Sequence, residues 1–162
     1  MPFESEDQRH LAAAQGYVEL GMLAEANEEL EQIDADVRHL PEVLEIRVRI
    51  YSAVKKWDLM QVVARQLAQC DPSNVRWTVL WAIATRRADC LEAARLILIN
   101  ALQVHPGEAI LHYNLACYEC QLGDIVIAKR RLSHAIDLDK KCKNMALDDP
   151  DLEPLWEYLN GA

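Results

Sequence analysis

A repeat of 34 residues is the feature of this chain that most restricts its fold. Residues 7–40, 41–74, 75–108 and 109–142 align with one another without insertions. A regular period of about 20 to 50 residues is typical of proteins built from stacked structural units. Three columns of the alignment hold mainly small or apolar residues: Ala14, Val48, Ala82 and Ala116; Ala26, Met60, Ala94 and Ala128; and Ile33, Leu67, Ala101 and Ala135.

Each repeat predicts two helices joined by a short turn. Small residues in the first two columns are expected where helices cross closely, because a large side chain would force the helices apart. The turn column contains glycine twice, and glycine tolerates the left-handed backbone that a tight turn needs. The first helix is predicted from a cap at Ser5 to Leu20, and the others cover 23–36, 41–54, 57–70, 75–88, 91–104, 109–122 and 125–138, with turn residues Gly21, Lys55, Asp89 and Gly123.

Several helix ends carry side chains that favour capping. Ser5 and Gln8 have the spacing of a capping box, Asp89 and Glu92 form a second such pair, and Asp124 precedes the helix predicted at 125–138. Residues 143–162 predict a short capping segment folded over the last repeat. Asp149 is expected to cap it, and the apolar residues expected to face inward are Leu152, Leu155, Trp156 and Leu159.

The repeats resemble the tetratricopeptide repeat family. Its repeat is a 34-residue helix–turn–helix, and the match is best in 109–142, which reads YNLA, LGD and AIDLD at the corresponding places. Repeat two departs most, with Lys55 for the turn glycine and Met60 for alanine. The tail is similar to the ending of some bacterial members. The resemblance implies an all-α fold, a right-handed superhelix of stacked antiparallel helix pairs, and we interpret 1–162 as a single domain.

Net charge limits the classes of partner. The chain carries −9 overall, and residues 1–40 contain ten acidic and two basic side chains, whereas 41–142 contain 14 basic and 11 acidic ones. Nucleic-acid binding needs a basic footprint, so it is not expected. No apolar run approaches the ~18 residues of a membrane span, and MPFESEDQRH lacks the layout of a signal peptide. A cytoplasmic location without membrane association is therefore expected.

Members of this family usually hold a peptide or helix of a partner in a concave groove lined by the first helix of each pair. Carried onto this chain, the resemblance implies peptide-binding residues on all four first helices. Arg49, Arg76 and Arg86 are expected to converge near the centre, where they would favour an acidic peptide or a terminal carboxylate. Ordinary helix-surface arginines, solvated or paired with Glu45, are the alternative. The full predicted set is Leu11, Gln15, Arg49, Arg76, Val79, Ile83, Arg86, Tyr113 and Cys117.

No pattern in the chain predicts catalysis. The sequence lacks a glycine-rich phosphate loop and a nucleophile elbow, and the five histidines are scattered singly. Cys117 and Cys120 form a C-x-x-C on one helix face, which suits half a zinc site, a redox pair, or two small residues that pack in or beside the groove. We therefore expect no enzyme activity, cofactor or metal. The preferred function is a scaffold that binds another protein; the alternatives are a self-associating structural protein, including a homodimer, and a metal or redox protein that uses these cysteines.

Overall fold

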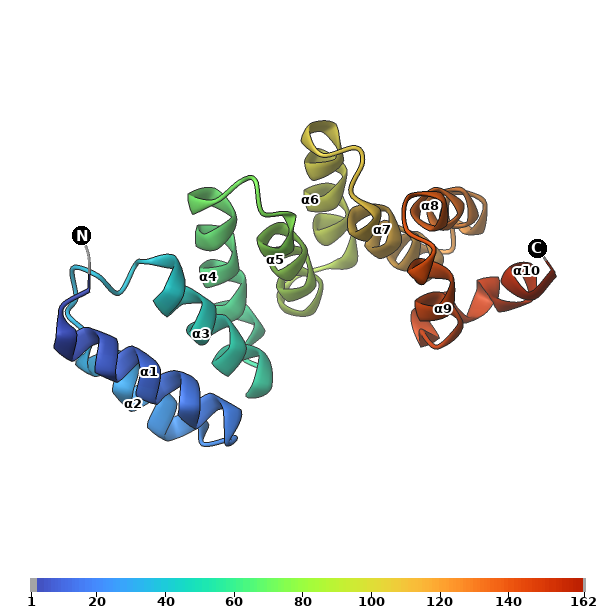
Figure 1. Cartoon of the computed structure of the whole chain (residues 1–162). Coiled ribbons are helices and arrows are strands. Elements are labelled where there is room, and N and C mark those ends of the chain that lie inside the picture. The colour runs from blue at the N-terminus through green and yellow to red at the C-terminus, as the bar shows by residue number, and fades with distance from the viewer. Residues whose placement is uncertain (1–2, 162) are drawn as a thin grey trace.

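The computed structural model describes residues 3–161, and its elements within that range are helical (Figure 1). The first two residues of the N-terminal stretch discussed above and Ala162 lie outside the described residues. Eight helices form four antiparallel pairs. Their bounds are α1 (Ser5–Glu19) and α2 (Leu23–Gln32); α3 (Pro41–Ala53) and α4 (Trp57–Cys70); α5 (Val75–Ala88) and α6 (Leu91–Val104); and α7 (Ala109–Leu122) and α8 (Ile125–Leu138).

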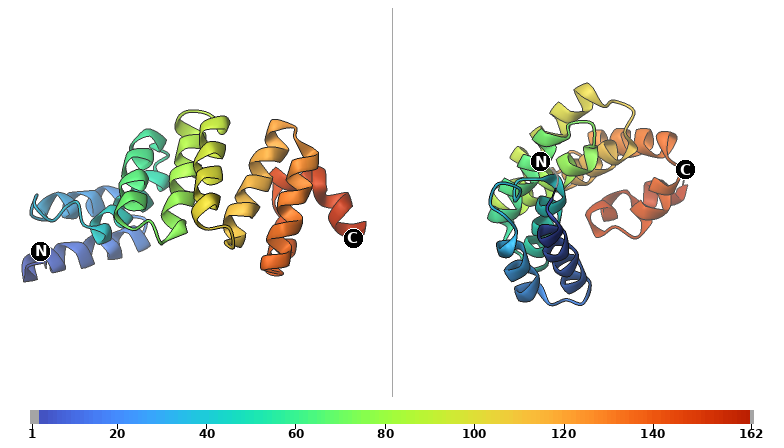
Figure 2. Two further views of the ribbon diagram at one scale, coloured as in Figure 1. Left: turned by 90° about the horizontal axis from the view of Figure 1, so that it is seen from above. Right: turned by 60° about the vertical axis from the view of Figure 1, so that its left-hand side comes forward.

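The pairs stack side by side into a curved right-handed superhelix. Three short elements follow the fourth pair: α9 (Lys141–Leu147), the 3-10 helix η1 (Pro150–Leu155) and α10 (Trp156–Gly161). Figure 2 shows this C-terminal segment, in red, turned back toward the inside of the curve. The chain is thus an all-α superhelix, as the repeat predicts, with an end that folds back onto it.

Five of the predicted helices have the bounds that the repeat gives them, which are α4 to α8. The turn column explains this regularity, since Gly21, Lys55 and Gly123 all have positive φ, at 74°, 58° and 87°. Asp89 differs, because its φ of −126° keeps it out of the left-handed region. The prediction of a turn in this column is confirmed, although one repeat makes it with a different backbone.

Several predicted caps are wrong. Helix α1 begins at Ser5, so that Ser5 lies inside the helix instead of capping it, and Gln8 bonds the carbonyl of Phe3. The cap of α6 is Cys90, whose sulfur accepts from the backbone N–H of Ala93, and Asp89 ends α5. Asp124 has the cap position of α8 but makes no side-chain cap hydrogen bond. Asp149 does cap η1, accepting from the N–H of Asp151.

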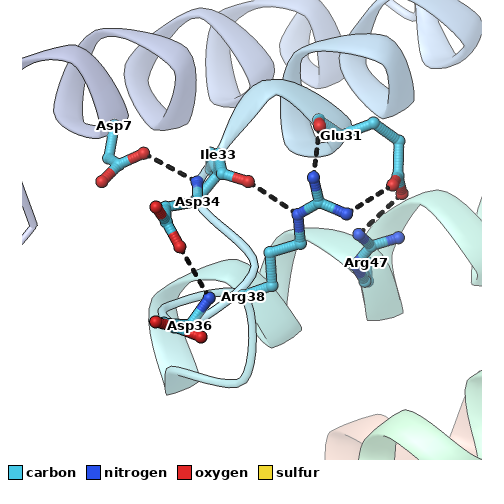
Figure 3. Close-up of polar contacts among 7 residues, drawn as sticks. All are labelled: Asp7, Glu31, Ile33, Asp34, Asp36, Arg38 and Arg47. Atoms are coloured by element: carbon cyan, nitrogen blue, oxygen red, sulfur yellow. Dashed lines mark hydrogen bonds and ion pairs between the residues drawn. The ribbon is translucent and has the colours of Figure 1, made fainter.

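Helix α2 ends at Gln32, four residues before the predicted end, because side chains bind the backbone that follows it (Figure 3). Asp7 of α1 accepts from the backbone N–H of Asp34 at 2.9 Å, and Asp34 accepts from the N–H of Asp36 at 2.8 Å. Arg38 donates to the carbonyl of Ile33 at 2.7 Å. These bonds satisfy backbone groups that a longer helix would have used internally.

Glu31 joins the first two repeats through two arginines (Figure 3). One carboxylate oxygen lies 2.9 Å from Arg38 and the other 2.8 Å from Arg47 on α3. The hydrogen bond from Arg47 lowers the pKa of Glu31, and the charges of Arg47 and Arg38 add to this effect. The loop between repeats one and two is therefore fixed on both sides by polar contacts.

We expect Asp7→Ala to destabilise the first repeat. Asp7 is only 7% exposed, and its loss leaves the N–H of Asp34 without an acceptor. A lost hydrogen bond to a charged group costs about 2 kcal/mol, which corresponds to a fall in Tm of about 6 °C for a chain of this size. Thermal unfolding followed by circular dichroism measures it. Asp36→Ala, at an exposed position, is the control, and equal Tm values for the two variants would contradict the role of Asp7.

The apolar core has three parts along the superhelix. One part joins α1, α2 and α3, the second joins α3, α4 and α5, and the third joins α5 to α8 and the C-terminal segment. The first two alignment columns are buried in every repeat. Trp77 is 7% exposed and belongs to the second part, and the half-buried Trp57 and Trp81 pack against it.

Candidate functional site

The inner surface of the superhelix is formed by the first helix of each pair: α1, α3, α5 and α7. Helical spacing places the predicted binding residues of each helix on one side, since positions three or four apart are neighbours. On α3, Glu45, Arg49 and Ser52 have this spacing. On α5, Arg76 and Leu80 have it, and Trp77 comes directly after Arg76. The inner surface divides into an open part at α1, α3 and α5 and a covered part at α7.

The open part contains a pocket of about 330 Å³, which we call the inner pocket. Arg49 is exposed, and Arg76 lies 3.8 Å from Glu45 and 5.4 Å from the centre of the Trp77 ring. The loose ion pair leaves the guanidinium of Arg76 free to bind a second anion, because 67% of its side chain is exposed. The lining residues are Val18, Glu45, Val48, Arg49, Ser52, Ala53, Met60, Arg76, Trp77 and Leu80.

The covered part is occupied by the chain's own C-terminal segment. The hydroxyl of Tyr113 donates to Asp149 Oδ2 at 2.8 Å, and the thiol of Cys117 lies 3.6 Å from the same oxygen. Arg86 Nη1 donates to Asp151 Oδ2 at 2.8 Å. Below these polar contacts, Leu152 and Leu155 are fully buried in the third part of the core. An acidic segment thus lies on the predicted groove, and it comes from this molecule.

The ionisation of these groups follows from their burial. Burial raises the pKa of the Tyr113 hydroxyl, and its hydrogen bond to Asp149 raises it further. Burial alone would lower the pKa of Arg86, but the hydrogen bond and charge of Asp151 outweigh it, so the pKa is raised. Tyr113 is therefore a neutral donor and Arg86 a cation over the accessible pH range, and both suit the carboxylates that they bind.

The structure separates the predicted binding residues into three groups. Arg49 and Arg76 line the inner pocket. Val79 and Ile83 pack with the third part of the core, the same part that holds Tyr113 and Cys117. Leu11 and Gln15 lie on α1 beyond the residues that line the inner pocket, half-buried and exposed respectively.

The expected convergence of three arginines is wrong for Arg86. Arg86 and Asp151 are 65 residues apart in the sequence, and their ion pair holds the Arg86 side chain against the C-terminal segment. It also lies 5.5 Å from the centre of the Tyr118 ring. Arg86 is therefore part of the covered surface, and Arg49 and Arg76 are the arginines of the inner pocket.

Cys117 and Cys120 lack the properties that a redox-active thiol requires. Both are buried, and burial raises the pKa of each thiol, for Cys117 with a further rise from the charges of Asp149 and Asp151. A reactive thiol needs a pKa below about 8.5 and access to solvent. Among residues 3–161, no three His, Cys, Asp or Glu side chains form a group that would hold a metal ion. These geometries favour the packing interpretation of the C-x-x-C pair.

Sequence reasoning missed the residues that build the covered surface. Asp149 caps the last segment as predicted, but its second oxygen also binds Tyr113, which the sequence did not indicate. Asp151 had no predicted role. A contact between residues so far apart in sequence leaves no local signal, although the acidic tail and the basic centre of the chain have complementary charges.

The fold is similar to solved structures of helical repeat proteins. MamA MSR-1 is 24% identical with a TM-score of 0.68, covering 82% of this chain and 76% of that one. MamA AMB-1 is 25% identical with a TM-score of 0.65, covering 80% and 76%. TTC0263, a thermophilic TPR protein in Thermus thermophilus, is 19% identical with a TM-score of 0.68, covering 94% and 82%.

Sequence comparisons add nothing to these similarities, since no family model and no curated protein matches the chain. No helix within residues 3–161 combines the length and the apolar character that crossing a membrane requires. The structural similarity and the 34-residue period together identify an all-α superhelix of stacked helix pairs.

Proposed function

Because the chain has the tetratricopeptide-repeat fold, we propose that it is a non-catalytic scaffold that binds a segment of another protein in the inner pocket. Solenoids of this type offer extended inner surfaces to other chains. The observation that carries the proposal is the open pocket of about 330 Å³ at α1, α3 and α5, lined by Arg49 and Arg76 beside apolar side chains. Its position agrees with the groove that the family resemblance implies.

The chemistry of the inner pocket favours a partner segment with both acidic and apolar side chains. Val48 and Met60 form an apolar floor, while the guanidinium groups of Arg49 and Arg76 bind carboxylates through planar pairs of N–H donors. Glu45 already pairs loosely with Arg76, so a partner carboxylate would compete with it. The proposed contact extends along α1 through Leu11 and Gln15 and along α5 to the half-buried Ile83, while the buried Val79 supports this surface from the core.

The chain's own tail supports this preference for acidic segments. Asp149 and Asp151 dock on the covered part of the same inner surface, through Tyr113 and Arg86. A surface that holds aspartates within the molecule supplies the donors that a partner's aspartates would need. The partner segment would therefore extend from α1 to α5 and end before α7.

We expect Arg49→Glu together with Arg76→Glu to abolish capture of the partner. The two changes reverse the charge of the inner pocket and place like charges opposite an acidic ligand. Affinity capture from host lysate with mass spectrometry compares this variant with the unaltered chain, after circular dichroism has shown equal helix content. The matched control is Arg9→Glu with Lys141→Glu, which makes the same charge change at exposed positions outside the pocket.

The outcomes of that comparison separate the remaining functions. A protein captured by the unaltered chain and the control, and lost from the pocket variant, supports the proposal. Equal capture by all three contradicts the role of the inner pocket. Recovery of the chain alone, with concentration-dependent mass in light scattering, would favour a self-associating scaffold instead.

A further inference from the structure

A second pocket, of about 380 Å³, lies at the last repeat, and its lining residues come from α7 and α8. We call it the α8 pocket. It shares no lining residue with the inner pocket, and its Ser133 hydroxyl bonds the Tyr158 hydroxyl of α10. The lining residues are His112, Arg130, Arg131, Ser133, His134 and Asp137.

The α8 pocket carries more positive than negative charge, since two arginines and one aspartate line it. Arg130 and Arg131 have no ion pair, hydrogen bond or aromatic partner among residues 3–161. Residues 125–143 contain six lysines and arginines against two aspartates, in a chain whose net charge is −9. This surface therefore attracts anions locally. Elsewhere in the chain, carboxylates pair with Arg38, Arg47, Arg76, Arg86 and Arg95.

His112 in the wall of this pocket has a polar atom without a partner. The residue is 7% exposed, and its Nε2 lies 2.9 Å from the carbonyl of Pro106, which accepts only. Nε2 therefore carries the proton. Burial lowers the pKa of His112, and the charges of His134 and Arg131 lower it further, so the ring is neutral and Nδ1 is an acceptor. Nδ1 is shielded from solvent with no donor near it, an arrangement that native proteins rarely leave unsatisfied.

The remaining polar groups include a second acceptor. Asp137 lies in the lining, and its carboxylate is 3.8 Å from the exposed Lys140. A fully ionised anion such as sulfate offers only acceptor oxygens, which suit the arginines but repel the carboxylate of Asp137. A phosphate with one protonated oxygen offers both: its anionic oxygens accept from the arginines, and its P–OH donates to an acceptor.

We propose that the α8 pocket binds inorganic hydrogen phosphate. Arg130 and Arg131 bind the anionic oxygens through charge-assisted hydrogen bonds. The imidazole of His134, whose ring centre lies 4.3 Å from that of His112 in an edge-on arrangement, forms the side of the site. The protonated oxygen donates to the carboxylate of Asp137. This site is independent of the inner pocket, and of the function proposed for it.

Isothermal titration calorimetry tests the proposal with inorganic phosphate as the probe, at constant ionic strength. We expect saturable binding of one phosphate per chain, and binding of sulfate at least about tenfold weaker, because a site that needs a donor rejects a ligand that lacks one. Arg130→Gln with Arg131→Gln should weaken phosphate binding by about tenfold or more. Arg9→Gln with Lys56→Gln removes the same charge at exposed positions outside both pockets and should leave phosphate binding unchanged.

A second readout follows the histidines directly. In NMR spectra, phosphate should shift the ring nitrogen signals of His112 and His134 and leave those of His10 and His39 unmoved. O-phosphoserine is a second acceptor-only probe, because its phosphate has mostly lost its last proton at neutral pH. It should therefore bind more weakly than inorganic phosphate, as sulfate does.

Three results would overturn the proposal. The first is an absence of saturable phosphate binding. The second is an equal loss of affinity in both arginine variants, which would indicate general charge attraction. The third is affinity for sulfate or O-phosphoserine equal to that for inorganic phosphate, which would indicate a diffuse basic surface and not a site for one protonated phosphate.

Discussion

Replacing Leu152 and Leu155 by alanine is expected to release the C-terminal segment and expose Cys117 to alkylation. Both leucines are fully buried against the last repeats. A buried Leu→Ala change costs about 3 kcal/mol. The two changes together are expected to exceed the free energy that holds the short segment against the repeats. Once η1 detaches, Cys117 loses its contact with Asp149, and its thiol becomes accessible.

The expected increase in the rate of Cys117 alkylation is at least about 100-fold, because losing about 3 kcal/mol, the cost of one leucine, already gives that factor. Each 1.4 kcal/mol lost from the closed state multiplies the open population by about ten. The burial that raises the pKa of Cys117 in the closed state disappears at the same time, so the thiolate fraction at neutral pH rises. Mass spectrometry after timed treatment with iodoacetamide resolves the labelling of each cysteine.

The chain supplies internal references for this experiment. Cys70 and Cys90 are exposed and should react at the same rate in all variants. Leu138→Ala, at a leucine 43% exposed, is the matched control and should leave Cys117 protected. A milder variant, Asp149→Ala with Asp151→Ala, removes only the polar contacts and should give an intermediate rate. Protection of Cys117 in the double leucine variant, with helix content retained, would show that the segment does not cover the groove.

The helical architecture is predictable from the sequence because it depends on short-range regularities. A positive φ recurs at Gly21 and Gly123, and even at Lys55, so the repeat period fixes where each turn falls. Alanine at the close contacts, such as Ala82 and Ala116, is visible in the alignment because every repeat makes the same contact. The bounds of α4 to α8 follow from these two facts.

The end of α2 and the use of the inner surface were less predictable. Helix α2 stops early because Asp7 binds the N–H of Asp34 across 27 residues, a contact that no local pattern reveals. The placement of Arg86 depends in the same way on where the tail folds. The family resemblance indicated the side of each helix that faces inward, and it did not indicate that part of this surface is filled by the chain itself.

Arg95→Met is expected to destabilise the junction between the third and fourth repeats by about 3 kcal/mol. Arg95 Nε on α6 lies 2.7 Å from Glu119 Oε1 on α7, and Glu119 is only 1% exposed. Removing one partner of a buried pair leaves an uncompensated buried charge, which is the costly case. The Arg95 side chain is 36% exposed, so solvent screens part of the interaction and the lower end of the usual range applies.

A double variant separates the buried charge from the lost contact. In Arg95→Met with Glu119→Gln the carboxylate is absent, so the double variant should be more stable than Arg95→Met alone, although it carries one change more. The expected order of Tm is therefore the unaltered chain, then the double variant, then the single variant about 9 °C below the unaltered chain. Thermal unfolding at neutral pH measures all three. A single variant as stable as the unaltered chain would mean that this pair behaves as an exposed ion pair, and that apolar packing alone holds α6 against α7.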